Sequence, residues 1–222
     1  MEKVIKLKKN EVPTYTLAEE LISAISHGIG VLLSIAALVL CVVSAAKHGN
    51  TMAVVGSCIY GTTLIILYTM STLYHSFKQG TKVKSIFRIF DHCSIFLLIF
   101  GSYTPIVLSA IGGTIGWAMF GILLLITILG ITLNAIDLEK YKKLSMFCYI
   151  LMGWMVIFTL KPAIEAVTAT GMIILAIGGI AYTIGAIIYG VGKKVKYMHS
   201  VWHFFVLAGS IIQFFTILLY VC

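Results

Sequence analysis

The stretch HCSIFLLIFGSYTPIVLSAIGGTIGWAMFGILLLITILGITLNAI, residues 92–136, decides the fold because it runs for 45 residues without Asp, Glu, Lys or Arg. A single helix of that length would overshoot the hydrocarbon core of a membrane, about 30 Å thick, roughly twofold. The stretch therefore predicts two membrane-spanning helices that are separated by a break at Gly112-Gly113.

Other apolar segments of spanning length lie on both sides of this stretch. A short turn at 47–50, a basic loop at 76–88, a charged loop at 137–143, Lys161-Pro162 and a basic loop at 192–197 separate them. We predict an all-α membrane protein, with a polar tail over residues 1–20 and a seven-transmembrane-helix bundle over residues 21–222. The predicted spans lie near 21–46, 52–75, 89–109, 114–134, 144–160, 166–190 and 198–221.

The composition agrees with a membrane protein. Of the 222 residues, 60% are hydrophobic and only 11% are charged, whereas a soluble domain carries about 25% charged residues. This composition excludes a soluble protein. The net charge of +8 is concentrated in short loops, where it indicates membrane orientation and not a nucleic-acid partner. Membrane lipids are the expected partners.

Lysine and arginine are distributed unevenly between the two predicted sides of the membrane. The tail and the loops after the second, fourth and sixth spans hold 4, 4, 3 and 3 of them, and the remaining loops hold only Lys47 and Lys161. By the positive-inside rule the amino terminus is cytoplasmic and the carboxyl terminus lies outside.

Two histidines lie early in the last span, within YMHSVWHFFVLAGS, residues 197–210. His199 and His203 are four residues apart, so on a helix they lie on one face, one above the other. Such a pair can supply two ligands to a metal such as zinc. The alternative is two histidines that hydrogen-bond to neighbouring helices.

The predicted topology brings further polar side chains to the same depth, at the cytoplasmic end. These are Glu20, Ser23 and His27 on the first span, Ser71 and His75 on the second, and Asp91 on the third. Polar groups at such a depth need partners, so we expect these side chains to converge with the two histidines of the last span.

Three imidazoles, those of His75, His199 and His203, match the three protein ligands that a catalytic zinc usually has beside a bound water. Asp91 is the available carboxylate that would orient or deprotonate this water. Alternatively, Asp91 is only the N-cap of the third span.

The remaining candidates are predicted to surround the ligands. Ser71 and Ser23 are candidate hydrogen-bond donors to the ligands or to an oxyanion. Glu20 is a further residue that we expect next to the ligands. His27 is expected to hydrogen-bond a carbonyl, because three histidines already fill the protein positions of an open zinc site. His92 follows Asp91 and points about 100° away on a helix, so it is not expected to be a ligand.

Three blocks of sequence together resemble a known family. They are Glu20-x-x-Ser23-x-x-x-His27-Gly28-x-Gly30, then Ser71-x-x-x-His75 followed by Phe90-Asp91-His92, and finally His199-x-x-x-His203. In this order, on seven spans and over nearly the whole chain, they resemble the hemolysin III-type proteins, the bacterial branch of the progestin and adipoQ receptor family.

The resemblance implies a zinc ion near the cytoplasmic face of a bacterial plasma membrane. It implies His75, His199 and His203 as its ligands and Asp91 reaching it through a water. Animal relatives are receptors with hydrolase-like sites, some of which cleave the amide of ceramide, and bacterial members are linked to cytolysis and lipid homeostasis. The large amino-terminal region of the animal receptors is not in this sequence, which argues against hormone reception.

Three functions are compatible with these features. The first is a zinc-dependent hydrolase of a lipid amide or ester, with a fatty-acyl substrate. The second is a membrane-perturbing, cytolytic protein in which the zinc is structural. The third is a receptor-like module that senses a lipid in membrane homeostasis. The sequence does not indicate the oligomeric state.

Overall fold

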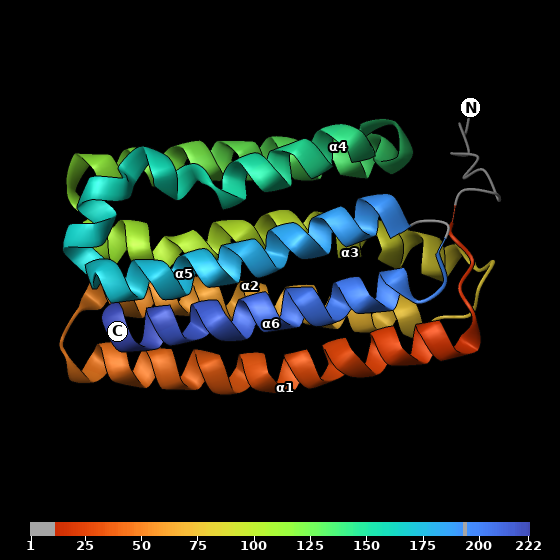
Figure 1. Ribbon diagram of the computed structural model, residues 1–222, viewed down its shortest axis with the longest axis horizontal. Helices are drawn as coiled ribbons and strands as arrows, with labels where there is room; N and C mark the ends of the chain where they lie inside the picture. The colour runs from red at the N-terminus through yellow and green to blue at the C-terminus, as the bar shows by residue number, and fades with distance from the viewer. Residues whose placement is uncertain (1–11, 193–194) are drawn as a thin grey trace, which may run out of the picture.

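The computed structural model describes residues 12–192 and 195–222, and all of its regular elements are helices. Residues 1–11 of the predicted tail, and two lysines of the last basic loop, lie outside the described residues. The helices, drawn in Figure 1, are α1 (Leu17–Lys47), α2 (Thr51–Ser76), α3 (Lys82–Pro105), the π-helical turn η1 (Ile106–Ile111), α4 (Gly113–Gly153), the 3-10 turn η2 (Met155–Thr159), α5 (Leu160–Val191) and α6 (Met198–Tyr220).

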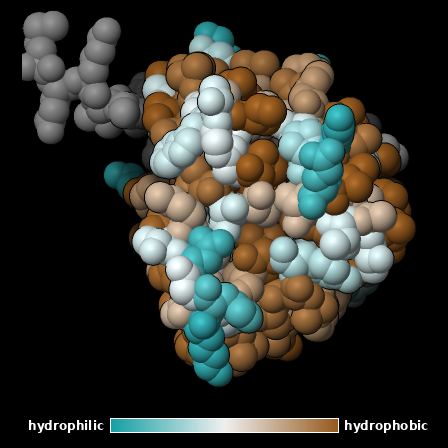
Figure 2. All heavy atoms as spheres, turned by 90° about the vertical axis from the view of Figure 1, so that its left-hand side faces the viewer, coloured by the Kyte–Doolittle hydropathy of each residue, from teal (hydrophilic) through white to brown (hydrophobic). Residues whose placement is uncertain are grey.

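The helices form a multi-pass membrane bundle. Five helical stretches are long and apolar enough to cross a membrane, and one of them, Gly113–Gly190, is 78 residues long and bent. Large apolar side chains such as Leu32 and Leu125 are exposed on the outside of the bundle. This outer surface is suited to lipid. The end of the bundle that faces the viewer in Figure 2 is more mixed, with hydrophilic residues among hydrophobic ones.

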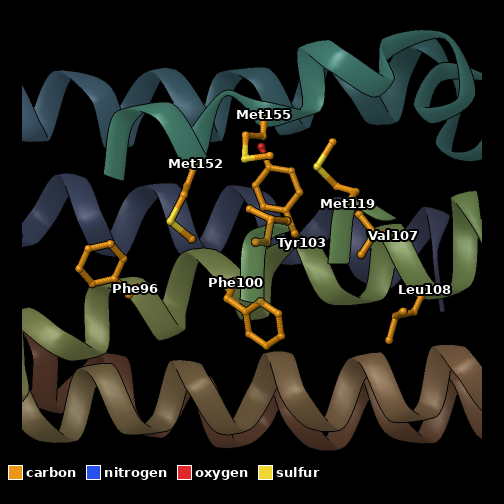
Figure 3. Close-up of a cluster of buried hydrophobic side chains, with 9 residues drawn as sticks. Phe96, Phe100, Tyr103, Val107, Leu108, Met119, Met152 and Met155 are labelled. Carbon is orange, nitrogen blue, oxygen red and sulfur yellow. The ribbon is translucent and has the colours of Figure 1, made fainter. Parts of the chain in front are cut away.

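Helix α4 reverses direction at Asp137, whose backbone angles are not helical (φ −159°, ψ 92°). Asn134, before the bend, accepts a hydrogen bond from Ser145 at 2.6 Å and donates one to Tyr149 at 3.3 Å. Met119 and Met152 belong to one core cluster with side chains of α3, as Figure 3 shows. The two halves of α4 therefore pack side by side, as an antiparallel pair (Figure 1).

The break at Gly112-Gly113 occurs where the sequence predicts it. Both glycines have positive φ, +59° and +54°, a region that side chains with a Cβ rarely occupy. Helix α3, in contrast, begins at Lys82 and not near 89, because Thr81 caps it by accepting a hydrogen bond from the backbone N–H of Lys84.

The predicted break at Lys161-Pro162 is not where the chain bends. Pro162 lies in the first turn of α5, where a proline costs no helical hydrogen bond. The bends lie on either side, at the 3-10 turn η2 and at Thr168, a non-glycine residue with φ +64°.

The packing order places the ends of four helices together. Helix α2 packs between α1 and α3, α6 packs on α5 and α1, and α4 packs mainly on α3. The beginnings of α1, α3 and α6 and the end of α2 consequently lie at the same end of the bundle (Figure 1). The histidines of the sequence motifs lie at this end.

Candidate metal centre

Three histidines from two helices direct their Nε2 atoms at one another. His75 lies in the last turn of α2, and His199 and His203 lie in the first turns of α6. The Nε2 atom of His199 is 3.2 Å from that of His75 and 3.2 Å from that of His203. His75 and His203 are 3% and 1% exposed. The ligand atoms of all three lie within 4.8 Å of one another, so the group could hold a metal ion.

These distances fit a metal such as zinc. Two nitrogens that each lie about 2.0–2.1 Å from a tetrahedral zinc are about 3.3 Å apart. Three nitrogens leave one tetrahedral position for a ligand from outside the chain. The donor set of three imidazoles also suits copper, iron or nickel, so the geometry indicates a metal site without fixing the element.

Glu20 orients His75. The Nδ1 of His75 donates a hydrogen bond of 2.6 Å to Oε2 of Glu20. This bond places the proton on Nδ1, so the lone pair of Nε2 faces the other two histidines. Oε1 of Glu20 pairs with Nζ of Lys84 at 2.8 Å.

Lys84 anchors this carboxylate from the start of α3. Its side chain is 1% exposed, and Nζ also donates to the backbone carbonyls of Tyr74 at 3.0 Å and Phe77 at 3.1 Å. A buried lysine with three acceptors is fully paired. The end of α2, the start of α3 and Glu20 of α1 are thereby joined behind His75.

The start of α6 is fixed to the start of α1. Glu19 forms a capping box with Thr16, and its Oε1 also accepts a hydrogen bond of 2.7 Å from the backbone N–H of Tyr197. Ser23 and Ser200 lie 3.2 Å apart, oxygen to oxygen. Ser23 thus lies in the α1–α6 interface, beside the turn that carries His199.

His27 supports His203 from α1. The two ring centroids are 3.9 Å apart, and Nε2 of His27 lies 3.4 Å from the backbone carbonyl oxygen of His203. Since a carbonyl only accepts, Nε2 donates this hydrogen bond. The contact is the kind of carbonyl bond that the sequence predicts for His27.

Asp91 and Ser71 face a common cavity. Together with His27 they line a cavity of about 100 Å³ between the helices. Asp91 lies well inside α3, which is capped by Thr81, so the alternative that Asp91 is the N-cap is wrong. Asp91 also lines a second cavity, which His199 and Trp202 border.

His92 is not one of the histidines whose ligand atoms converge. Its Nδ1 lies 3.0 Å from the carbonyl oxygen of Arg88, and its Nε2 lies 3.3 Å from the hydroxyl of Tyr189. Nδ1 is also 3.6 Å from Oδ2 of Asp91. The structure thus places His92 next to the carboxylate but not among the three converging histidines.

Tyr15 covers the histidine cluster, a contact that the sequence did not predict. Its ring stacks on that of His199, with centroids 4.5 Å apart and planes 19° from parallel. Burial raises the pKa of the Tyr15 phenol above its usual range, so the ring is neutral. An aromatic residue shortly before a capping box was the available signal, but the sequence alone does not show where such a residue folds.

Comparisons with known proteins agree with the sequence motifs. Residues 15–214 match the family model "Haemolysin-III related". The chain is 42% identical over 208 residues to "Hemolysin-3" of Bacillus cereus, covering 94% of each chain. It is 40% identical over 206 residues to "Hemolysin-3 homolog" of Bacillus subtilis (strain 168), covering 93% of this chain and 96% of the relative.

A human protein is a more distant relative. The chain is 27% identical over 166 residues to "Monocyte to macrophage differentiation factor" of Homo sapiens, covering 72% of this chain and 67% of the relative. The family model spans most of the chain and includes all three histidines of the cluster. The protein is therefore a multi-pass membrane protein that belongs to the haemolysin-III related family.

Proposed function

We propose that the protein is a zinc-dependent hydrolase that cleaves an amide or ester bond of a membrane lipid. The observation that carries this proposal is the convergence of three histidine nitrogens, one of which belongs to His199 on the border of a cavity that Asp91 also lines. Asp91 and Ser71 together line a neighbouring, largely apolar cavity. An apolar cavity inside a membrane bundle suits an acyl chain, and a carboxylate beside a metal suits hydrolysis.

Each residue has a role in this proposal. His75, His199 and His203 hold the zinc, and Glu20 keeps the lone pair of His75 directed at it. When bound, zinc polarises a carbonyl and lowers the pKa of water to about 7. Asp91 accepts the proton of the attacking water, and Ser71 donates a hydrogen bond to the carbonyl oxygen. Tyr15 shields the histidines from solvent.

The proposal includes an orientation in the bacterial plasma membrane. Helix α4 crosses twice because it reverses at Asp137, and the chain then makes seven crossings. With Lys and Arg concentrated in alternate loops, the amino terminus and the histidine cluster lie on the cytoplasmic side and the carboxyl terminus lies outside.

The decisive experiment compares the purified protein with its Asp91→Asn variant on amide-linked and ester-linked lipids. Fatty-acid release should fall by roughly 100-fold or more in the variant, the scale of lost general-base assistance. Zinc content should not change, because Asp91 is not a ligand. Normal turnover by a fully zinc-loaded Asp91→Asn protein would rule out this role.

A second candidate function is perturbation of membranes with a structural zinc, which the name of the Bacillus cereus relative favours. Lysis of erythrocytes or vesicles separates the two. If lysis persists in the Asp91→Asn variant while no lipid is hydrolysed by the unaltered protein, the second function replaces the first.

A further inference from the structure

The cavity beside Asp91 continues far along the bundle. Residues of α1, α2, α3, the second half of α4, α5 and α6 line it, and its far wall includes Tyr103, Trp154 and Gln213. The same three residues line a third, apolar cavity between η1, η2 and α5. Gln213 therefore stands where the two cavities adjoin, remote from the histidines.

Other polar side chains in this region are satisfied by neighbouring protein groups. The hydroxyl of Tyr103 donates to the carbonyl of Gly153 at 2.9 Å, and Nε1 of Trp154 donates to Thr183 at 3.1 Å. Oε1 of Gln213 is buried and accepts no hydrogen bond from any described residue. An unpaired amide oxygen in the interior of the bundle is unfavourable, so it indicates a ligand group that donates a hydrogen bond.

Helix α5 is shaped to seat this glutamine. A Cβ at Gly178 would lie 2.6 Å from Cγ of Gln213 and 3.2 Å from the carbonyl oxygen of Gly209. Real Cβ atoms do not approach so closely, so a larger residue at 178 would displace the glutamine. The side chain of Gln213 is therefore held in place against α5.

The spacing along α6 sets the reach of a ligand. Gln213 follows His203 by ten positions, which is about 15 Å at 1.5 Å per residue. An extended acyl chain advances about 1.25 Å per carbon, given C–C bonds of about 1.5 Å. A chain whose head group lies at the histidines thus passes Gln213 at about its twelfth carbon.

We propose that Gln213 is a second polar subsite, which binds a hydroxyl carried on the acyl chain of the lipid about twelve carbons from its head group. A hydroxyl both donates and accepts, so it pairs with the amide in either orientation. This inference rests on the proposed function only in placing the head group at the histidine cluster.

Three fatty acids test the subsite on purified, zinc-loaded protein in detergent: octadecanoic acid, its 12-hydroxy derivative and its 7-hydroxy derivative. Equilibrium binding is measured by native mass spectrometry. The 12-hydroxy acid should bind about fivefold more tightly than octadecanoic acid, the ratio that one net hydrogen bond supplies. The 7-hydroxy acid should show no such gain, because its hydroxyl lies about five carbons short of Gln213.

The matched variants are Gln213→Met and Gln79→Met, the second of which lies in the α2–α3 loop. Gln213→Met should lose the preference for the 12-hydroxy acid, and Gln79→Met should keep it. Without a lipid ligand, Gln213→Met should have a Tm at least as high as the unaltered protein, because a buried, unpaired amide oxygen has been removed. Zinc content checks that each variant is folded.

Equal affinities for octadecanoic acid and its 12-hydroxy derivative, or a preference that survives in Gln213→Met, would overturn the subsite. A lowered Tm of Gln213→Met would also do so, because it would mean that the amide has a structural partner. The proposed hydrolysis fails on a different result, namely the absence of fatty-acid release. A protein that prefers the 12-hydroxy acid but releases no fatty acid would retain the subsite and lose the hydrolase.

Discussion

At the scale of single residues, one carboxylate determines the tautomer and the ring orientation of His75. Glu20 accepts the Nδ1 proton of His75 and is itself held by Lys84. Partners of this kind, behind a ligand, typically change metal affinity by about 10–100-fold when they are removed. Their effect is exerted through the tautomer and the ring orientation.

Glu20→Gln should therefore weaken zinc binding by about 10–100-fold while leaving all three histidines in place. Competition with a chelator of known affinity measures the change. The matched control is Glu139→Gln, which alters a carboxylate that pairs with Arg88 and Lys142. Equal zinc affinities of Glu20→Gln and the unaltered protein would show that Glu20 does not orient the ligand.

Substitution of the histidines tests the metal site itself. His203→Ala should lose most of the zinc, since two ligands remain, whereas purified unaltered protein should hold about one zinc per chain. His48→Ala should retain it, because His48 lies at the other end of α1 and contacts the carbonyls of Ser44 and Cys222. Metal analysis by mass spectrometry measures the zinc content of each variant. A His203→Ala protein that still holds about one zinc per chain would contradict the assignment of the metal site.

The sequence predicts the histidine cluster because local spacing places His199 and His203 on one face, and topology brings His75 to the same end. The positions of Tyr15 and Lys84 depend on how the segment before α1 and the start of α3 fold against the cluster. Such contacts have no periodic signal in the sequence. The position of Gln213 in the cavity wall likewise depends on Gly178 of another helix.

At the scale of the elements, helix α4 depends on polar contacts across its own bend. Asn134 is fully buried and joins Ser145 and Tyr149 of the returning half. The charged loop predicted at 137–143 is in fact a bend at Asp137 alone, after which the helix resumes. We therefore expect Asn134 to help hold the two halves together.

Asn134→Leu should lower the free energy of unfolding by about 1–3 kcal/mol, because it leaves buried hydrogen-bonding groups on the returning half without their partner. Denaturant titration in detergent micelles measures this. Thr132→Val, on the exposed face of the same turn, should change stability little. Equal stabilities of the two variants would indicate that the reversal does not rely on Asn134.

Helix boundaries show which local signals are reliable. Gly112-Gly113 breaks the chain because positive φ favours glycine. Lys161-Pro162 was expected to do the same, but a proline is tolerated in the first turn of a helix, and α5 begins just before it. A proline therefore indicates that a helix boundary is near. Whether the proline lies just before or just after that boundary depends on the packing of the adjacent segments.

At the scale of the whole molecule, the charge distribution predicts the orientation. The basic turn around Gly80 lies at the end of the bundle that carries the histidines, whereas Cys222 lies at the opposite end (Figure 1). A reporter that is active only outside the cytoplasm should work when fused after Cys222 and fail when inserted at Gly80. The reverse pattern would place the histidine cluster on the outer side.

His75 leaves the ribosome well before His199 and His203, since 123 residues separate it from the first of them. A metal that binds all three can be taken up only after the last helix has been threaded into the bilayer and has met α2. Metal binding therefore links α2, an early part of the chain, to α6, the last helix. Nascent chains that stop before α6 would carry only His75 of the three converging histidines, and metal retention would distinguish finished molecules from truncated ones during biogenesis.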